Sequence, residues 1–231
     1  MERLPNGLTL EILPGAFPLS TDSMLLAEFV RLPRDARVLD LGSGCGTLGV
    51  LLCACHPRCQ VTGVELDPAA HACALENIRR NGLNGRMESI CADLRLLPPE
   101  ISRGSFPCCV SNPPYFSGGP ASETHPIARR EDCCDPASLF SAAASALRYG
   151  GDFYLVHRPE RLAELIVCAG KAGLEAKRLR LIRHKAGGAV TLVLLSFRKG
   201  GKPGLLWEEE ALFAENGQPT DYYRRVYHQE P

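Results

Sequence analysis

The chain has no long apolar stretch, no C-x-x-C pair and few aromatic residues. No apolar run in its 231 residues approaches the roughly 18 that a membrane-spanning helix needs. The first 20 residues contain Glu2, Glu11 and Pro14, and they lack the apolar core of a secretory signal. We therefore expect a protein that does not cross a membrane and that works in the cytoplasm.

Eleven cysteines are present, but their spacing favours neither a metal site nor a disulfide framework. Zinc sites use wider, repeated pairs of ligands, whereas the near neighbours here are Cys53 and Cys55 and the adjacent pairs at 108–109 and 133–134. Other cysteines, such as Cys45, stand among small apolar residues, as buried thiols do. We expect structural thiols and no bound metal.

Charge is balanced overall, with 26 basic and 26 acidic residues, but it is unevenly distributed. Residues 171–202 carry nine Lys or Arg against one acid, a net charge of +8. Residues 203–231 carry two arginines against six acids, or −4, and residues 1–170 supply the other −4. A basic segment of this kind suits an anionic partner, and equally suits an edge strand guarded by solvated basic residues. The sequence leaves both interpretations open.

Short apolar runs alternate with helical patterns along most of the chain. Strands are expected at 37–41, 60–65, 87–91, 106–111 and 152–157, and two more follow at 174–183 and 189–197. Helices are expected at about 45–56, 68–81, 136–149 and 159–170. This order predicts an α/β fold with a mostly parallel, seven-stranded sheet, helices on both faces and an antiparallel hairpin at one edge.

Three parts of the chain can be distinguished by this pattern. Residues 1–35 form a lead-in, in which Thr21 or Asp22 is expected to cap a short helix that runs to about Arg31. Residues 36–200 form one domain, and residues 201–231 form an extension that is expected to pack on it. Whether residues 10–13 pair as a strand is left open.

A glycine-rich turn, Asp40-Leu41-Gly42-Ser43-Gly44-Cys45-Gly46, follows the first strand of this domain. Ligands of doubly wound sheets bind where strands end, and glycine allows the backbone to approach them closely. The spacing is G-x-G-x-G, which differs from the motifs for dinucleotides and for nucleoside triphosphates. We expect cofactor contacts from Asp40, Gly42, Gly44 and Gly46.

Acidic residues end the next two expected strands. Glu65 follows Gly42 by 23 residues, near the offset at which an acid reaches the hydroxyl groups of a ribose. Asp93 follows the third strand, where it can accept a hydrogen bond from an adenine amine or simply cap a turn. Because glycines, Glu65 and Asp93 stand at matching ends of three consecutive strands, we favour one cofactor site.

Asn112-Pro113-Pro114-Tyr115-Phe116 follows the fourth strand. Proline fixes φ and restricts the residue before it, so the Asn112 amide oxygen and the Pro113 carbonyl are expected to point outward at a fixed separation. Two such acceptors suit an –NH2 group, and Tyr115 or Phe116 can stack on a flat ring that carries it. The predicted catalytic residues are Asn112, Pro113, Pro114 and Tyr115, and Asn112 also borders the cofactor.

Taken together, these motifs resemble the class I, Rossmann-like methyltransferases that use S-adenosylmethionine (SAM), over roughly residues 36–200. The resemblance implies SAM as cofactor and in-line transfer of its methyl group to a positioned nitrogen. In relatives, Asn-Pro-Pro-Tyr is typical of enzymes that methylate amines of adenine, cytosine or guanine, and of those that methylate glutamine in release factors.

Residues 19–27, 128–131, 156–162 and 177–180 are similar to the bacterial tRNA1(Val) adenine-N6-methyltransferase family. This resemblance implies methylation of an adenine amine near the anticodon of a tRNA. It also implies a lead-in that covers the cofactor, with Thr21 and Asp22 as contacts. The implied substrate contacts are Tyr115, Phe116, Arg129, Arg130, Arg178 and Arg180. Since Arg178 and Arg180 alternate with leucines, a strand places both on one face, where they can hold tRNA phosphates.

Other functions remain open at this point. A release-factor glutamine methyltransferase shares Asn-Pro-Pro-Tyr, although that family usually carries a helical N-terminal domain for which about 35 residues are too few. Methylation of rRNA or DNA bases and a non-catalytic RNA-binding role on this fold are further alternatives. The intact Glu65 and Asn112 favour an enzyme. The sequence does not indicate an oligomeric state.

Overall fold

The computed structural model describes residues 2–4, 7–12, 20–114 and 135–228. Its strands are β1 (Glu2–Arg3), β2 (Thr9–Leu10), β3 (Arg37–Leu41), β4 (Gln60–Glu65), β5 (Met87–Cys91), β6 (Phe106–Ser111), β7 (Leu147–His157), β8 (Leu174–Lys185), β9 (Val190–Lys199) and β10 (Leu206–Phe213). Its helices are α1 (Thr21–Phe29), α2 (Thr47–Cys55), α3 (Pro68–Arg80), α4 (Pro136–Ala146), α5 (Leu162–Lys171) and α6 (Asp221–Val226), with short 3-10 turns η2 (Leu94–Leu96) and η4 (Pro159–Arg161).

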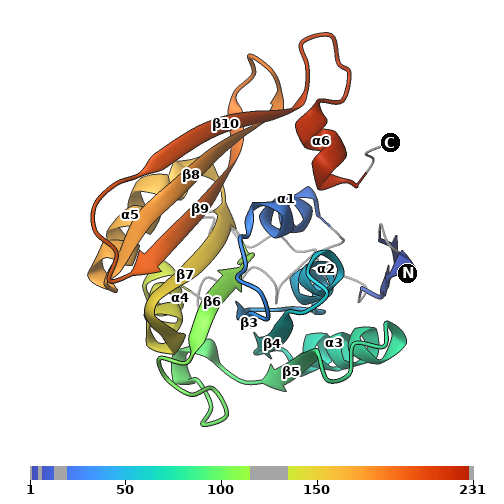
Figure 1. Cartoon of the computed structure of the whole chain (residues 1–231), viewed down its shortest axis with the longest axis vertical. Helices are drawn as coiled ribbons and strands as arrows, with labels where there is room; N and C mark the ends of the chain where they lie inside the picture. The colour runs from blue at the N-terminus through green and yellow to red at the C-terminus, as the bar shows by residue number, and fades with distance from the viewer. Residues whose placement is uncertain (1, 5–6, 13–19, 115–134, 229–231) are drawn as a thin grey trace, which may run out of the picture.

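One large sheet organises the molecule, with strand order β10-β8-β9-β7-β6-β3-β4-β5. All neighbouring strands pair in parallel except β9, which is antiparallel to β7 and to β8. The expected α/β class and the antiparallel hairpin are confirmed. The sheet has eight strands, however, and not seven, because β10 pairs with β8 and takes the edge position that the hairpin was expected to hold. Figure 1 shows β10 as the outermost strand beside β8.

Local sequence signals explain most of the helix starts. Asp67 and Asp135 accept hydrogen bonds from backbone N–H groups of the first turns of α3 and α4, and a proline follows each of them. The N-cap of α1 is Ser20, whose side chain accepts from the Ser23 N–H, so capping by Thr21 or Asp22 was wrong. Ser20 takes this role because it is the residue with extended φ and ψ angles.

The end of α4 also differs from the expectation. The helix ends at Ala146, and residues 147–151 belong to β7, although Tyr149-Gly150 was expected to terminate the helix. Leu147 pairs with Phe106 of β6, and Gly150 has a φ of 77° within the strand. The glycine therefore marks a turn of the backbone inside a long strand rather than a helix terminus.

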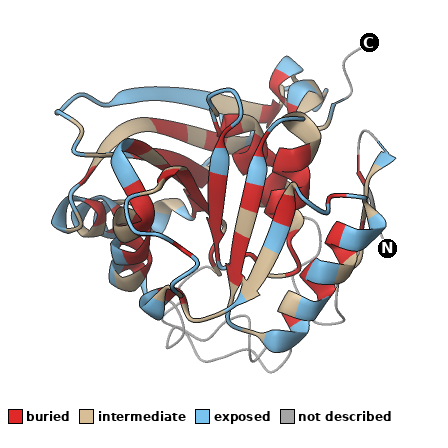
Figure 2. Ribbon diagram, turned by 60° about the horizontal axis from the view of Figure 1, so that its bottom comes forward, coloured by how far each residue is buried: buried red, intermediate tan, exposed pale blue. Residues whose placement is uncertain are grey.

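Two apolar layers enclose the sheet, because successive side chains of a strand point to opposite faces. Val38 and Val110 belong to the cluster under α1, α2 and α3, whereas Leu39 and Cys109 belong to the cluster under α4 and α5. Figure 1 shows these two groups of helices on opposite sides of the sheet. Buried residues follow the central strands, as Figure 2 shows. No helix of the described residues is long and apolar enough to span a membrane.

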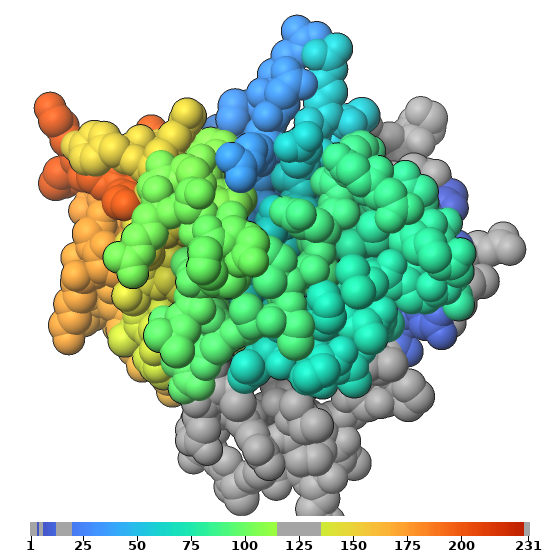
Figure 3. Space-filling model, turned by 90° about the horizontal axis from the view of Figure 1, so that it is seen from below, coloured from blue at the N-terminus to red at the C-terminus, as the bar shows by residue number. Residues whose placement is uncertain are grey.

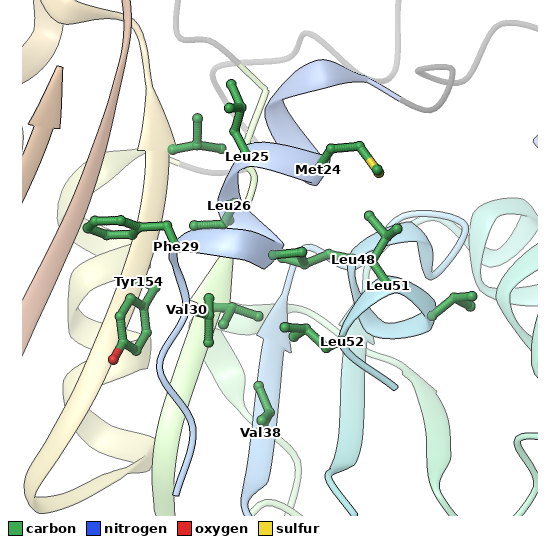
Figure 4. Close-up of a cluster of buried hydrophobic side chains, with 14 of the residues drawn as sticks. Met24, Leu25, Leu26, Phe29, Val30, Val38, Leu48, Leu51, Leu52 and Tyr154 are labelled. Atoms are coloured by element: carbon green, nitrogen blue, oxygen red, sulfur yellow. The ribbon is translucent and has the colours of Figure 1, made fainter. Parts of the chain in front are cut away.

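Helix α1, from the lead-in, is part of the main core. Its side chains Met24, Leu25, Leu26 and Phe29 are all at most 4% exposed. The Phe29 ring meets Tyr154 of β7 edge-on, with ring centroids 6.0 Å apart. Figure 4 shows α1 lying between β7 and α2, with its apolar residues directed at both. The position of α1 is thus determined by packing along much of its surface.

The two margins of the sheet are built differently. At one margin, residues of α3, β5 and the segment after β5 form a broad surface, which Figure 3 shows in teal and green, with residues of the α5 and β8 part of the chain in orange at the other side. At the far margin, the acidic strand β10 lies on the basic strand β8, with Glu208 in register with Arg180. The negative tail therefore neutralises part of the basic segment by direct strand pairing.

Candidate active site

The glycine turn joins the end of β3 to α2. Gly42, Gly44 and Gly46 have φ angles of 73°, 55° and 80°, a region that side chains disfavour. The Gly42 N–H donates to the Val64 carbonyl of β4 at 2.9 Å, which folds the turn back against the sheet. A Cβ added at Gly42 or Gly44 would meet nothing within 4 Å, so space is open beside these two residues. A ligand can therefore approach this backbone closely.

Glu65, at the end of β4, holds two turns at once. Its Oε2 accepts from the Gly44 N–H at 2.7 Å, and its Oε1 accepts from the Asp67 N–H at 2.8 Å. Each carboxylate oxygen can accept a second hydrogen bond. The same side chain thus fixes the glycine turn and retains acceptor capacity for the paired hydroxyl groups of a ribose.

Asp40 lies beneath this turn and is 1% exposed. Burial, together with the negative charge of Glu65, raises the pKa of Asp40 to about 7. Its Oδ2 has no hydrogen-bond partner among the described residues. A buried acceptor without a partner, beside open glycines and the Glu65 carboxylate, fits a cofactor that brings hydroxyl and amino donors.

Asn112 immediately follows β6, the strand on the other side of β3. Its Nδ2 donates to the Oγ of Ser23 in α1 at 2.9 Å, and Ser23 is 5% exposed. No hydrogen bond within the described residues involves the Asn112 amide oxygen or the Pro113 carbonyl. The contact with Ser23 selects one orientation of the amide, in which the oxygen has no partner among the described residues and can accept from an external group. Pro113 is buried and Pro114 is half-buried beside it.

The remaining expected cofactor contacts have partners of their own. Asp93 accepts from the backbone N–H of Arg95 and forms an ion pair with its guanidinium, and these hydrogen bonds hold the pKa of Asp93 below its ordinary value. The Thr21 hydroxyl bonds the Tyr227 hydroxyl at 2.8 Å, which links the lead-in to the end of the chain. Asp22 lies half-buried beside it. Of the expected set, the glycine turn, Asp40, Glu65 and Asn112 come from the adjacent strands β3, β4 and β6.

Four expected substrate residues, Tyr115, Phe116, Arg129 and Arg130, lie outside the described residues. Their roles stay predictions.

Within the described ranges, no group of three or more His, Cys, Asp or Glu comes together in a way that could hold a metal ion.

Arg178 and Arg180 do share one face of β8, but their surroundings do not suit the expected contact with phosphates. Arg180 has a side chain that is 7% exposed and lies between Glu28 and Glu208. Burial lowers the pKa of Arg180, but Tyr222 and the two glutamates raise it above its ordinary value. Phosphate binding by Arg180 stays a prediction, and the structure does not favour it, because the charge of Arg180 is enclosed and already paired. Arg178 pairs with Glu208 at 3.1 Å and lies over the Phe29 ring.

Two residues important to the site were missed. Ser23 lies within residues 19–27 of the lead-in, and nothing in the local sequence indicates its contact with Asn112. Asn77 of α3 is fully buried; its side chain bonds the backbone N–H and carbonyl of Glu11 at 2.7 and 2.8 Å and the carbonyl of Cys45 at 2.9 Å. Asn77 thereby ties the lead-in to the glycine turn. An asparagine inside an amphipathic helix, on its buried face, was the available signal.

Comparison with known families agrees with this geometry. Residues 9–167 match the family described as methyltransferase small domain. The chain therefore belongs to this family of methyltransferases, and S-adenosylmethionine is its methyl donor.

Individual relatives give more detail than the family match. A tRNA1(Val) (adenine(37)-N6)-methyltransferase of Bacteroides fragilis is 30% identical over 187 residues, which cover 79% of this chain and 77% of that protein. The protein of the same name from Edwardsiella ictaluri is 34% identical, over 77% of this chain and 72% of its own length. Among solved structures, a predicted O-methyltransferase from Agrobacterium tumefaciens has a TM-score of 0.75 at 22% identity, covering 90% of this chain and 95% of its own. That structural likeness shows the shared fold.

The buried Asp40 predicts a pH dependence of stability. Because its folded-state pKa, about 7, exceeds the ordinary value of 3.8, folding favours the protonated carboxyl. This stabilisation is complete below about pH 4 and is lost as the pH rises through 7. In the absence of SAM, Asp40→Asn should therefore gain at least ~1 kcal/mol relative to the wild type between pH 5 and pH 8. Urea unfolding at both pH values measures this difference.

The matched control is Asp221→Asn, whose side chain is 89% exposed and whose difference from the wild type should not change with pH. Parallel pH profiles for the wild type and Asp40→Asn would show that Asp40 is ionised without cost in the folded protein.

Proposed function

We propose that the chain transfers a methyl group from SAM to the N6 amine of an adenine in tRNA, near the anticodon. The observation that carries this proposal is the Asn112 amide, whose Nδ2 donates to Ser23 while no described residue bonds its oxygen, at the end of the strand next to β3 and its glycine turn. Support for tRNA as substrate comes from the curated relatives, which are named for this reaction. A tRNA substrate also supports the expected cytoplasmic location.

The residues of the turn and of β4 bind the donor. Backbone of Gly42 and Gly44 can lie against the amino-acid part of SAM, and Glu65 can accept the ribose hydroxyls through the lone pairs that its two backbone partners leave unused. SAM supplies a methyl group on a sulfonium, which leaves a neutral thioether after transfer. The protein needs no nucleophile for this step, and the methylated amine releases one of its protons to solvent after transfer.

Asn112 and Pro113 hold the acceptor. The Asn112 oxygen and the Pro113 carbonyl accept the two hydrogens of the adenine amine, which turns the nitrogen lone pair toward the methyl group. Positioning of two reactants at about 3–3.5 Å in line accounts for much of the catalysis available to such a displacement. The base must leave its stack to reach this loop, and the expected aromatic partners are Tyr115 and Phe116.

Nucleoside analysis tests the substrate directly. Unmodified tRNA prepared by transcription is incubated with the protein and labelled SAM, digested, and separated by mass. We expect labelled N6-methyladenosine, because two carbonyl-type acceptors fit an exocyclic amine. A release factor with an unmodified glutamine is assayed in parallel, together with rRNA fragments and duplex DNA. Label in the protein glutamine, or only in rRNA or DNA, with none in tRNA would replace the proposed substrate.

Substitution of Asn112 tests the mechanism. Asn112→Ala removes the amide oxygen that accepts from the amine, so turnover should fall by at least about a hundred-fold, the loss typical of a transition-state hydrogen-bonding group. The SAM dissociation constant, measured by calorimetry, should change less than about three-fold, since the glycine turn and Glu65 remain. The control is Asn216→Ala, in an exposed turn, with wild-type turnover. Loss of SAM binding in Asn112→Ala would assign this residue to the cofactor alone.

A further inference from the structure

A hollow lies on the face of the sheet that carries α1, away from the glycine turn. It has a volume of about 320 Å³. Its walls come from the segment after α1 and from β7, β8 and β9, and its lining residues are Arg31, Leu32, Pro33, Asp152, Tyr154, Lys177, Arg178, Ser196 and Arg198. We refer to this hollow as the basic pocket.

Positive charge dominates the basic pocket. Four of its residues are Lys or Arg and one is acidic, which leaves +3 on the lining residues. The acid, Asp152, accepts hydrogen bonds from Nε and Nη2 of Arg198, at 2.8 and 2.9 Å. Glu208, outside the pocket, pairs with Arg178 and reduces the excess to +2. Two cationic side chains thus lack a carboxylate.

These two side chains are Arg31 and Lys177. Arg31 is exposed and forms no ion pair within the described part of the chain. Among the described residues, the Lys177 Nζ donates only to the carbonyl of Lys202, at 2.9 Å, so its charge is not balanced by a carboxylate there. Both side chains are therefore available to an anion in the pocket, and charge-assisted hydrogen bonds to such an anion are about twice as strong as neutral ones.

The rest of the pocket is suited to the same kind of ligand. Burial lowers the pKa of Arg178, and the nearby positive charge of Arg31 acts in the same direction, so the cations repel one another when no anion is present. Ser196 lines the pocket, and its hydroxyl forms no hydrogen bond with any described residue, so it can donate to an oxygen. The Tyr154 hydroxyl donates to the Arg31 carbonyl at 3.1 Å, which fixes the backbone at the rim.

The pocket lies on the same side of the molecule as the helix that holds Asn112. The segment 31–33 directly follows α1, and Tyr154 pairs with Val110, two residues before Asn112. From a strand rise of about 3.3 Å per residue and a strand spacing of about 4.8 Å, the pocket lies roughly 10–20 Å from Asn112. A duplex strand carries a phosphate about every 3.4 Å along its axis. An RNA whose adenine reaches Asn112 can place another phosphate, several nucleotides away, over the pocket.

We propose that the basic pocket binds a backbone phosphate of the tRNA, through Arg31, Lys177 and the Ser196 hydroxyl. This inference rests on the proposed function for the identity of the RNA. In this proposal the basic pocket, and not Arg180, holds the phosphate, because Arg180 is enclosed and the pocket is open. A contact of this kind supplies affinity and register and carries no base information.

The test is a charge-matched pair of double variants. Arg31→Gln with Lys177→Gln removes the two cations of the pocket, whereas Arg103→Gln with Arg148→Gln removes two exposed cations outside it. The dissociation constant of tRNA is measured across a range of salt concentrations. The pocket variant should lower the slope of log K against log salt by about 0.7–0.9, the value for one phosphate contact. The control variant should keep the wild-type slope.

Kinetics add a second measurement. In the pocket variant the KM for tRNA should rise by about ten-fold or more with kcat nearly unchanged, because the lost contact exists equally in the ground and transition states. The SAM dissociation constant should equal that of the wild type. Equal slopes and equal KM values in the two double variants would overturn the pocket assignment.

A further experiment distinguishes an RNA phosphate from free phosphate as the ligand of the basic pocket. Inorganic phosphate is titrated into the wild type and the pocket variant at constant ionic strength. Phosphate binding could be lost in the pocket variant while the salt slope of tRNA binding stays the same. The basic pocket would then be a site for a small anion, and the proposal would be overturned. Failure of the proposed function is distinguishable: it appears as absence of N6-methyladenosine in tRNA treated with the wild type, whatever the salt slopes of the variants.

Discussion

The position of β3 between β4 and β6 is the constraint on which the site depends. Asp40 of β3 is in register with Gly63 on one side and with Val110 on the other, and both pairings are parallel. Parallel strands end at the same edge, so the glycine turn, Glu65 and Asn112 leave the sheet together. Two hydrogen bonds then define the site: Gly44 N–H to Glu65 at 2.7 Å, and Asn112 Nδ2 to Ser23 Oγ at 2.9 Å. The first supports the part of the site proposed to bind SAM, and the second supports the part proposed to hold the accepting amine.

The distribution of surface charge also depends on which strands are neighbours in the sheet. In sequence, the basic segment and the acidic tail look like separate features with separate partners. In the structure, β10 lies on β8, and Glu208 neutralises Arg178 and Arg180 by direct contact. The charge that remains for a partner is carried by residues outside this pairing, Arg31 and Lys177 among them. The net charge of residues 171–202 therefore overstated how many basic side chains are available to RNA.

The sequence predicted the elements with strong local signals and missed those that depend on distant partners. The strands at 60–65, 87–91 and 106–111 have the expected bounds, because each is an apolar run between turn residues. β10 was not expected, since a run of three glutamates has a low intrinsic strand propensity and is stabilised here by arginines of β8. Ser23 lies 89 residues from Asn112, so no local pattern could connect the two.

The central claim is that Ser23 acts on the reaction only by orienting the Asn112 amide. A double-mutant cycle on single-turnover methyl transfer, followed with labelled SAM, tests this claim most directly. Ser23→Ala should slow transfer about ten-fold, the cost of roughly one hydrogen bond, whereas Ser141→Ala, at an exposed serine of α4, should leave the rate unchanged. In the Asn112→Ala background, Ser23→Ala should cause no further loss. Independent losses that multiply in the double variant would contradict the account.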